Sequence, residues 1–227
     1  MNTRFSDWGI IDYMEAWCRQ ESIFKSLVEA KQGKKDTSIW EQFVFCEHPH
    51  VFTLGKNGNT NNMLVNKDML ASLGASFYKV NRGGDITYHG PGQIVGYPLL
   101  DLENYHLSLK QYLYCLEETI IRVLAHYGIA GERLPGATGV WLDAHSSKPR
   151  KICAMGVRAS HFVTMHGFAL NVCTDLKYFK LINPCGFKDK DVTSIFLEIN
   201  TVPEMEDIKN TIQQEWTRMM ETKNLFL

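Results

Sequence analysis

The segment RGGDITYHGPGQ, residues 82–93, contains four glycines and a proline among twelve residues, together with an arginine and a histidine. Because glycine loses more conformational entropy on folding than any other residue, so dense a run needs a physical reason. Two reasons are open: a loop that turns sharply, or a backbone that must lie directly against a ligand. The run before it (76–81) predicts a strand, and the apolar run after it (93–102) predicts a buried strand. The segment is therefore expected to be a loop that joins two strands.

The composition is that of one folded domain spanning residues 1–227. Apolar residues make up 44% of the chain and charged residues 22%, which argues against long disordered segments. The formal net charge of −1 offers no general attraction for nucleic acid, so no nucleic-acid partner is expected. No apolar stretch is long enough for a signal peptide or a membrane span, which predicts a cytoplasmic protein without a membrane partner. No coiled-coil seam is visible, and a monomer is expected.

Hydrophobic periodicity and capping signals predict separate helices and hairpin-like strands. Helices are expected at residues 12–31, 66–74, 108–127 and 203–223, with a helical turn at 178–182. Strands are expected at residues 39–48, 50–55, 76–81, 93–102, 138–144, 151–160 and 162–172. Asn66 and Ser108 are expected to cap the second and third helices. This pattern favours the α+β class, with a mixed or antiparallel sheet covered by helices.

Six cysteines occur without a C-x-x-C pair or a disulfide-framework spacing, which predicts reduced thiols. Five of them fall inside helical or strand-like runs, where a thiol is usually a small buried hydrophobic group: Cys18, Cys46, Cys115, Cys153 and Cys173. Cys185 differs, because it lies between Pro184 and Gly186 in the turn-like run INPCG. A thiol there is presented on a restricted backbone with room for a substrate beside it. We therefore expect Cys185 to be a nucleophile.

A cysteine attacks as the thiolate, so Cys185 needs a neighbouring group that takes its proton. His89 and His166 both lie in glycine-containing runs and are candidates for that role. Lys151 is another candidate, because it begins the apolar run KICAMGVR and burial would lower its pKa. The residue types alone leave a Cys–His pair and a Cys–Lys pair both open.

The sequence gives little indication of a metal-binding site or a nucleotide-binding site. The run HPH (48–50) resembles a chelating pair, but proline separates the two histidines and no acidic or thiol companion lies at ligand spacing. No glycine run is followed by Lys-Ser or Lys-Thr, as a Walker loop requires. No metal ion and no cofactor are expected.

Several motifs together resemble the signature of the lipoyl (octanoyl) transferase family. They are RGGDITYHGPGQIVGYPLLDL around the glycine-rich segment, EHPHVFTLGKNG before it, and GVW, KICAMGVR, TMHGFALNV, DLKYF and INPCG after it. The match keeps this order over roughly residues 10–200, which makes it far more specific than one glycine motif. The resemblance implies an α+β catalytic fold shared with biotin and lipoate protein ligases.

The resemblance also implies an activity, the first step of protein lipoylation. An octanoyl group would move from the phosphopantetheine thioester of acyl carrier protein to a lysine of a lipoyl domain. The acceptors would be the lipoyl domains of 2-oxoacid dehydrogenases and the H protein of the glycine-cleavage system. Exchange between two thioesters is nearly isoenergetic and needs no ATP, and transfer to an amine gives a more stable amide.

The functional residues of the family map onto this chain one by one. The acyl-accepting cysteine corresponds to Cys185 and the activating lysine to Lys151, which favours the Cys–Lys pair by analogy. The substrate-binding positions form three segments: Arg82, Gly83, Gly84, Asp85, Ile86, Thr87, Tyr88 and His89; Ala154, Met155 and Gly156; and Gly167, Phe168 and Ala169. Thr87, Tyr88 and His89 are expected to form a polar wall beside the acyl chain. Alternation along the strand would place Cys153 on the same side as Lys151.

Three other functions share some of these features. An ATP-dependent lipoate or biotin protein ligase would have the same fold but would need no nucleophilic cysteine. An amidotransferase that moves octanoyl groups between lipoylated proteins would use a cysteine with a different donor. A protein that only binds acyl carrier protein would need neither Cys185 nor Lys151. The presence of both residues favours the transferase.

Overall fold

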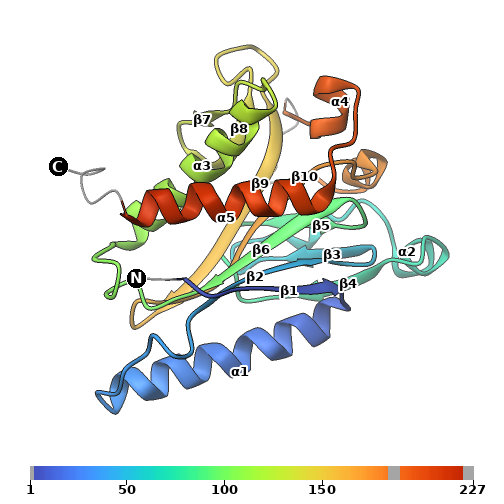
Figure 1. The fold of residues 1–227 in the computed structure, drawn as a ribbon. Coiled ribbons are helices and arrows are strands. Elements are labelled where there is room, and N and C mark those ends of the chain that lie inside the picture. The colour runs from blue at the N-terminus through green and yellow to red at the C-terminus, as the bar shows by residue number, and fades with distance from the viewer. Residues whose placement is uncertain (1–2, 184–189, 222–227) are drawn as a thin grey trace.

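In the computed structural model, which describes residues 3–183 and 190–221, the strands form two sheets (Figure 1). The larger sheet has the order β1-β2-β6-β10-β9-β8-β7, and β11 also pairs with β9. Its strands are β1 (Phe5–Ile10), β2 (Gln42–Glu47), β6 (Gln93–Leu99), β7 (Glu132–Leu134), β8 (Ala137–Leu142), β9 (Arg150–Ser160), β10 (Val163–Asn171) and β11 (Asp191–Val192). The smaller sheet has the order β4-β3-β5, with β3 (Val51–Leu54), β4 (Ser76–Lys79) and β5 (Ile86–His89). Parallel and antiparallel pairs occur in both sheets, so the predicted mixed sheet is confirmed.

Helices cover both faces of the larger sheet, which confirms the predicted α+β class. They are α1 (Tyr13–Gln32), α2 (Lys67–Ser72), α3 (Leu109–His126), α4 (Ile195–Ile199) and α5 (Met205–Glu221), with 3₁₀ turns η1 (Thr60–Asn62) and η2 (Leu176–Leu181). The helices α3 and α5 pack together on one side of the sheet, and α1 lies on the other side (Figure 1). Within the described residues, no helix combines the length and the apolar character that a membrane span requires.

Side-chain caps begin the helices close to where the sequence predicts them. Asp12 caps α1 by accepting the N–H of Met14 at 2.8 Å, and Asn66 caps α2. Ser108 and Gln111 form a reciprocal capping box at the start of α3, so two otherwise unpaired N–H groups are satisfied. The predicted helices at both ends of the chain are likewise present as α1 and α5.

Four of the described strands lie where the sequence predicts none: the short β7 and β11, and the longer β1 and β5. Of the longer two, β1 pairs in parallel with β2 and extends one edge of the larger sheet. The other, β5, lies inside segment 82–93, where the glycines predict a continuous loop. It pairs with β3, with Ile86 opposite Leu54 and His89 opposite Val51. The run Ile-Thr-Tyr-His is free of glycine and rich in residues that favour strands, and this local preference outweighs the glycines on either side.

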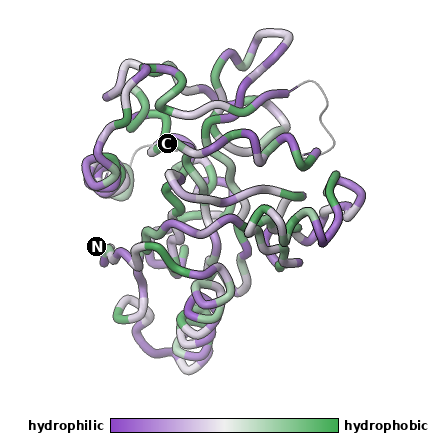
Figure 2. The backbone as a smooth tube through the Cα atoms, turned by 90° about the vertical axis from the view of Figure 1, so that its right-hand side faces the viewer, coloured by the Kyte–Doolittle hydropathy of each residue, from purple (hydrophilic) through white to green (hydrophobic). Residues whose placement is uncertain are grey.

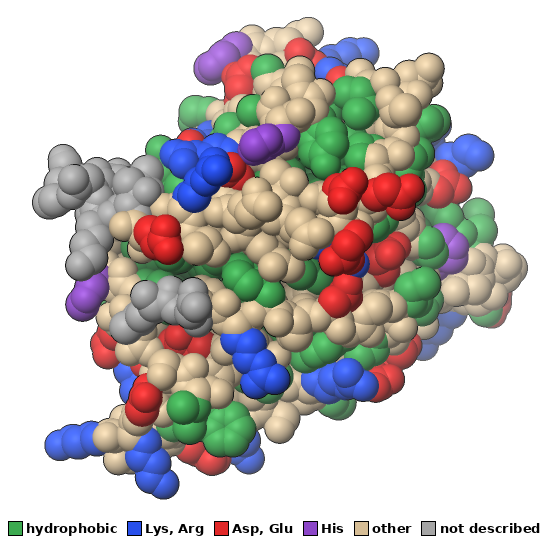
Figure 3. Space-filling model, viewed as in Figure 1, with side chains coloured by type: hydrophobic (Ala, Val, Ile, Leu, Met, Phe, Trp, Pro, Cys, Tyr) green, Lys and Arg blue, Asp and Glu red, His purple; other side chains and the backbone are tan. Residues whose placement is uncertain are grey.

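The larger sheet buries a separate hydrophobic core on each face, and apolar segments accordingly gather in the interior (Figure 2). On the side of α3 and α5, Phe43, Leu116 and Trp216 are fully buried. On the side of α1, Leu27 and Val44 are fully buried. Each such side chain contributes roughly 1.5–3 kcal/mol by leaving water. Charged groups of both signs are interspersed over the surface seen in Figure 3.

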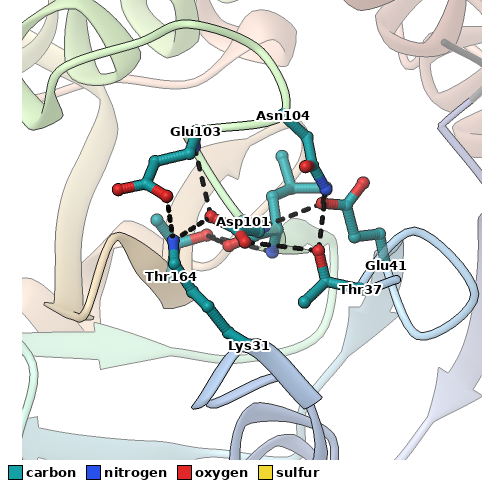
Figure 4. Close-up of polar contacts among 8 residues, drawn as sticks. Lys31, Thr37, Glu41, Asp101, Glu103, Asn104 and Thr164 are labelled. Carbon is teal, nitrogen blue, oxygen red and sulfur yellow. Dashed lines mark hydrogen bonds and ion pairs between the residues drawn. The ribbon is translucent and has the colours of Figure 1, made fainter. Parts of the chain in front are cut away.

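A polar network ties the end of α1 to the chain that follows β6 (Figure 4). The Nζ of Lys31 lies 2.5 Å from an Asp101 oxygen and 3.0 Å from a Glu103 oxygen. The Thr37 hydroxyl donates to the other Asp101 oxygen at 3.2 Å, and Glu41 accepts the N–H of Asp101 at 3.0 Å. Asp101 is only 3% exposed, so its negative charge depends on Lys31 for compensation.

Replacing Lys31 by methionine should therefore destabilise the protein by about 3 kcal/mol, because the Asp101 carboxylate would remain buried without its cation. Urea denaturation at neutral pH measures the free energy of unfolding. The control is Lys25→Met, which makes the same change at an exposed position of the same helix. Equal and small losses in the two variants would contradict a structural role for the Lys31 ion pair.

Candidate active site

A cavity of about 490 Å³ is lined by both sheets and by the glycine-rich segment between β4 and β5. Its walls contain all the predicted substrate-binding residues except Tyr88: Arg82, Gly83, Gly84, Asp85, Ile86, Thr87, His89, Ala154, Met155, Gly156, Gly167, Phe168 and Ala169. Lys151 lies in the same wall. The fold thus brings three segments that are distant in the sequence to one cavity.

A bulge in β9 decides which side of the sheet Lys151 faces. The register of β9 against β8 shifts by one residue between Lys151 and Cys153. As a result, Ile152 and Cys153 both enter the core on the α3 side, while Lys151 and Ala154 line the cavity. The expectation that Cys153 lies on the same side as Lys151 is wrong, because it assumes an unbroken alternation along the strand.

The side chain of Lys151 extends toward β8. Its Nζ donates to the carbonyl oxygen of Thr138 at 3.2 Å and lies 4.4 Å from the centre of the Trp141 ring. Gly139 has a φ of 122° and lies so close to β9 that a Cβ on Gly139 would collide with the backbone of β9. Since Gly139 pairs with Ala154, the lysine amine lies near the Ala154 level of β9.

Glycines hold the segment before β5 against its neighbours by direct backbone contact. The N–H of Gly83 donates to the carbonyl of Val157 at 2.9 Å, and a Cβ on Gly156 would lie 2.8 Å from the Gly83 oxygen. On the other side of the segment, a Cβ on Gly55 would collide with the carbonyl of Gly84. Close packing of three backbone segments therefore accounts for these glycines, and it also fixes the segment as a wall of the cavity.

Arg82 is buried in that wall, with 7% of its surface exposed. Its guanidinium donates to the carbonyl oxygen of Thr53 at 2.7 Å, to the Thr53 hydroxyl at 2.9 Å and to the carbonyl of Gly83 at 3.0 Å. These bonds join β3 to the glycine-rich segment. The guanidinium also places a positive charge beside His89 and His166.

Tyr88 is the predicted contact residue that does not line the cavity. Successive side chains of a strand point to opposite faces, and Thr87 and His89 are the β5 residues whose polar groups belong to the cavity wall. Tyr88 instead packs against Phe52 in the core of the smaller sheet, and its hydroxyl lies 2.6 Å from Nδ1 of His50. The predicted polar wall is therefore corrected to Thr87 and His89, because this part of the segment is a strand.

Three buried histidines lie in or next to the cavity, and all are neutral near pH 7. Burial lowers the pKa of His48 to about 4 and that of His166 to about 3, and it lowers the pKa of His89 well below the usual value. The Nδ1–H of His48 donates to the carbonyl of Ile11 at 2.8 Å, so its Nε2 accepts from the Tyr97 hydroxyl at 2.7 Å.

The cavity also contains residues that the sequence analysis did not single out as substrate-binding positions. They are Tyr13, Val95, Tyr97, Leu109, Leu113, Gly136, Ala137, Thr138, Val157, Phe179 and Val192. Most are ordinary apolar residues of strands and helices, and composition cannot distinguish such residues from the core. Alternation along the strand at 93–102 was the available signal for Val95 and Tyr97, which share one face of β6.

Cys185 lies outside the described residues, as do Pro184 and Gly186. The residues that flank this gap are held on both sides. Asn183 donates its N–H to the carbonyl of Asn62 at 2.8 Å. Val192 pairs with Lys151 in the β9–β11 ladder and lines the cavity. The described chain therefore resumes directly beside Lys151.

The remaining cysteines divide into two groups. Cys46, Cys115 and Cys153 are buried, as predicted, and burial raises the pKa of each thiol. Cys18 and Cys173 are exposed, so the prediction of burial is wrong for these two. Cys18 lies on the face of α1 that is exposed to water, and Cys173 follows the end of β10 at Asn171 rather than belonging to the strand.

The two histidines of the HPH run do not converge on one point. His48 bonds to Ile11 and Tyr97, whereas His50 bonds to Tyr88 of the smaller sheet. Within residues 3–183 and 190–221, no three His, Cys, Asp or Glu side chains are grouped in a way that suits a metal ion.

Acid should destabilise the fold beneath the cavity. The pKa of His48 is about 4 in the folded protein and 6.5 in the unfolded chain, so the unfolded chain binds more protons between these values. Stability therefore falls as the pH drops from 6.5 toward 4. His48→Gln should reduce this slope by up to about 1.4 kcal/mol per pH unit, as measured by urea denaturation across that range. The exposed His145→Gln is the control, and an equal change in both variants would contradict the assignment.

Comparison with known proteins identifies the family. Residues 12–217 match the model of the lipoyl protein ligase A/B catalytic domain. An octanoyltransferase of Bacteroides fragilis is 54% identical over 215 residues, which cover 95% of this chain and 96% of the relative. An octanoyltransferase of Cytophaga hutchinsonii is 49% identical over 222 residues, covering 95% of this chain and 91% of the relative.

Solved structures show the same fold at low sequence identity. A bi-partite lipoate protein ligase from Thermoplasma acidophilum matches with a TM-score of 0.67 and 14% identity, covering 97% of this chain and 84% of that one. A lipoate-protein ligase A bound with ATP matches with a TM-score of 0.66 and 13% identity, covering 97% and 86%. Taken with the relatives of similar length, these matches show that the chain belongs to the lipoyl protein ligase A/B catalytic domain family and, within it, to the octanoyltransferases.

Proposed function

We propose that this protein transfers an octanoyl group from acyl carrier protein to a lysine of a lipoyl domain, through a thioester on Cys185. The observation that carries the proposal is the position of Lys151, which lies in the wall of the cavity and pairs with β11, the strand that follows Cys185 in the sequence. The acceptors are lipoyl domains of 2-oxoacid dehydrogenases and the glycine-cleavage H protein, and the enzyme acts as a cytoplasmic monomer. The octanoyltransferase relatives support the choice of acyl group.

Small residues provide a floor on which an acyl chain can lie. Ala154 pairs with Ala169, and Gly156 pairs with Gly167, across β9 and β10. All four line the cavity, so an acyl chain can approach the sheet closely. Val95, which pairs with Ala169, continues this floor onto β6. Burial of an eight-carbon chain contributes about 0.8 kcal/mol for each methylene, and it requires no charged partner.

Lys151 is better suited than the buried histidines to take the proton of the cysteine. A base whose pKa lies far below the working pH holds a proton poorly, and the pKa values of His89 and His166 are both strongly lowered. His89 also donates its Nδ1–H to Gln93 at 2.8 Å, and Gln93 is bonded in turn to Asn171. We assign His89 the role of positioning the glycine-rich segment, which leaves Lys151 as the base.

The reaction then has two half-reactions. First, Lys151 takes the thiol proton of Cys185, and the thiolate attacks the carbonyl carbon of the donor thioester. The bond between that carbon and the donor sulfur breaks, and the departing thiolate receives the proton from Lys151. Second, the amine of the acceptor lysine attacks the Cys185 thioester and loses a proton to Lys151. Cys185 departs as the thiolate and receives that proton from Lys151, so the lysine is neutral again and no nucleotide is consumed.

The test is mass spectrometry of the protein after mixing with octanoyl-loaded acyl carrier protein in the absence of ATP. An octanoyl adduct on the peptide that contains Cys185 is expected, and it should disappear when a lipoyl domain is added. Lys151→Met should slow formation of the adduct by about 10²–10⁴-fold, because a positioned proton acceptor contributes that much. Cys185→Ala should form no adduct at this peptide.

The matched control is Lys148→Met, which removes an exposed lysine three residues from Lys151. It should load at the rate of the unmodified protein. Acylation that appears only when ATP and free octanoate or lipoate are supplied would overturn the proposal in favour of a ligase. An adduct that forms equally fast in Lys151→Met would remove the assigned base.

A further inference from the structure

One peptide group lies between the cavity lysine and a carboxylate of α3, which packs against β8 (Figure 1). The carbonyl oxygen of Thr138 accepts from Nζ of Lys151 at 3.2 Å. The N–H of the next residue, Gly139, donates to Oε1 of Glu117 at 2.9 Å. The carbonyl and the N–H belong to the same peptide unit. Lys151 and Glu117 therefore bind a single amide from its two ends.

The dipole of this peptide group favours both of the charges that it separates. In a trans peptide the C=O and N–H bonds point in opposite directions, and the unit has a dipole of about 3.5 D. Its negative end faces the ammonium group of Lys151, and its positive end faces the carboxylate of Glu117. Because the oxygen and the nitrogen of one peptide lie about 2.3 Å apart, the two charged groups lie within about 8.5 Å of each other.

The conformation of Gly139 sets the direction of this peptide group. Its φ is 122°, whereas φ in a regular antiparallel strand is about −140°. The reversed sign rotates the peptide between Thr138 and Gly139 away from the orientation that a regular strand would give it. A Cβ at Gly139 would also lie 2.5 Å from the carbonyl oxygen of Cys153. Glycine is therefore needed here both for the positive φ and for the close approach to β9.

An arginine of β7 holds the carboxylate of Glu117 in place. The Nε of Arg133 donates to Oε2 of Glu117 at 3.1 Å, and the side chain of Glu117 is only 13% exposed. Arg133 also bonds to Glu118 at 2.8 Å, and its guanidinium lies 3.8 Å from the centre of the Tyr114 ring. Glu117 thus directs one oxygen to Gly139 and the other to Arg133, and its position does not depend on exposed, mobile groups.

Lys151 lies among charges of both signs. The Nζ of Lys190 lies 5.2 Å from the centre of the Trp141 ring, and the Nζ of Lys151 lies 4.4 Å from the same point. Burial raises the pKa of the neighbouring Cys153 thiol, the positive charge of Lys151 lowers it, and the negative charge of Glu117 raises it. A nearby cation disfavours the ammonium form of Lys151, and the carboxylate of Glu117 opposes that effect.

We propose that Glu117 is a positioning residue for Lys151 and that, through the peptide between Thr138 and Gly139, it stabilises the ammonium group formed when the lysine takes the thiol proton. The proposal rests on the proposed function for the role of Lys151 as the base. Nucleophile and base are often completed by a third group that orients the base, as an aspartate does for the histidine of serine proteases. Glu117 is not among the described residues that line the cavity, so it acts on the base across one peptide group.

The first measurement is the rate at which trace acetic anhydride labels the amine of Lys151 at pH 7, read by mass spectrometry of the labelled peptide. The full-length protein carries Cys185→Ala throughout, so that no thiol captures the acetyl group and passes it to the lysine. Glu117→Gln removes the negative charge with little change in shape. Lys151 should then react about tenfold faster, because a larger fraction of the amine is neutral.

Glu118→Gln is the matched control, because it makes the same change at a residue that also binds Arg133. It should alter the labelling of Lys151 by less than about threefold, since it leaves the bond between Glu117 and Gly139 in place. Lys31, whose amine is held by Asp101, should stay slow to react in both variants and so reports that the fold is intact. Unchanged labelling of Lys151 in Glu117→Gln, or an equal change in both variants, would overturn the proposal.

The second measurement connects Glu117 with acyl transfer and uses the protein with Cys185 present. Glu117→Gln should form the octanoyl adduct about tenfold more slowly, because the ammonium group of Lys151 is less stable, and Glu118→Gln should load at nearly the unmodified rate. An unchanged rate in Glu117→Gln would overturn its role in the reaction. Absence of the adduct in the unmodified protein would instead count against the proposed function, and the labelling of Lys151 would still decide whether Glu117 acts on that lysine.

Discussion

The backbone contact between the glycine-rich segment and β9 is the constraint on which the cavity depends. The N–H of Gly83 donates to the carbonyl of Val157. Gly156 has no side chain, so the backbone of β9 can lie directly against that of the glycine-rich segment. This contact joins the smaller sheet to the larger one, and the cavity lies beside it. Both partners are main chain, so a single methyl group at Gly156 would push the segment outward together with Arg82. The position of the cavity wall and that of the buried Arg82 charge therefore depend on the same backbone contact.

The chemistry of the cavity comes from two departures from regular strand geometry. The bulge in β9 turns Lys151 into the cavity and sends Cys153 into the core. The left-handed conformation of His166 brings that residue to the cavity side of β10. Between them lies a floor of small residues such as Ala154 and Gly167. Two regular strands would provide that floor alone, and the irregularities add a polar group at each end.

Much of this arrangement could be predicted from the sequence, and the failures share a cause. Capping residues such as Ser108 and long apolar periodicities act locally, so most strands and every described α-helix except the short α4 were predictable. Motifs located the parts of the cavity wall formed by the glycine-rich segment, β9 and β10, because glycine and histidine stand out in a sequence, but not the parts formed by α1, α3 and β8. The errors at Tyr88 and Cys153 arise where the direction of a side chain depends on strand register, which the partner strand sets. His166 shows the same limit, because nothing in its neighbours reveals a positive φ.

The buried histidines of the cavity wall are held in their neutral form. Burial and the nearby Arg82 charge both disfavour protonation of His89 and His166. A neutral imidazole can accept a hydrogen bond, but it does not compete with Lys151 for a proton at neutral pH. In the proposed mechanism, the histidines therefore stay neutral while Lys151 carries the proton. Burial, reinforced by the Arg82 charge, keeps His89 and His166 neutral, so the cavity wall can include both rings without adding a positive charge beside the apolar chain of the proposed substrate.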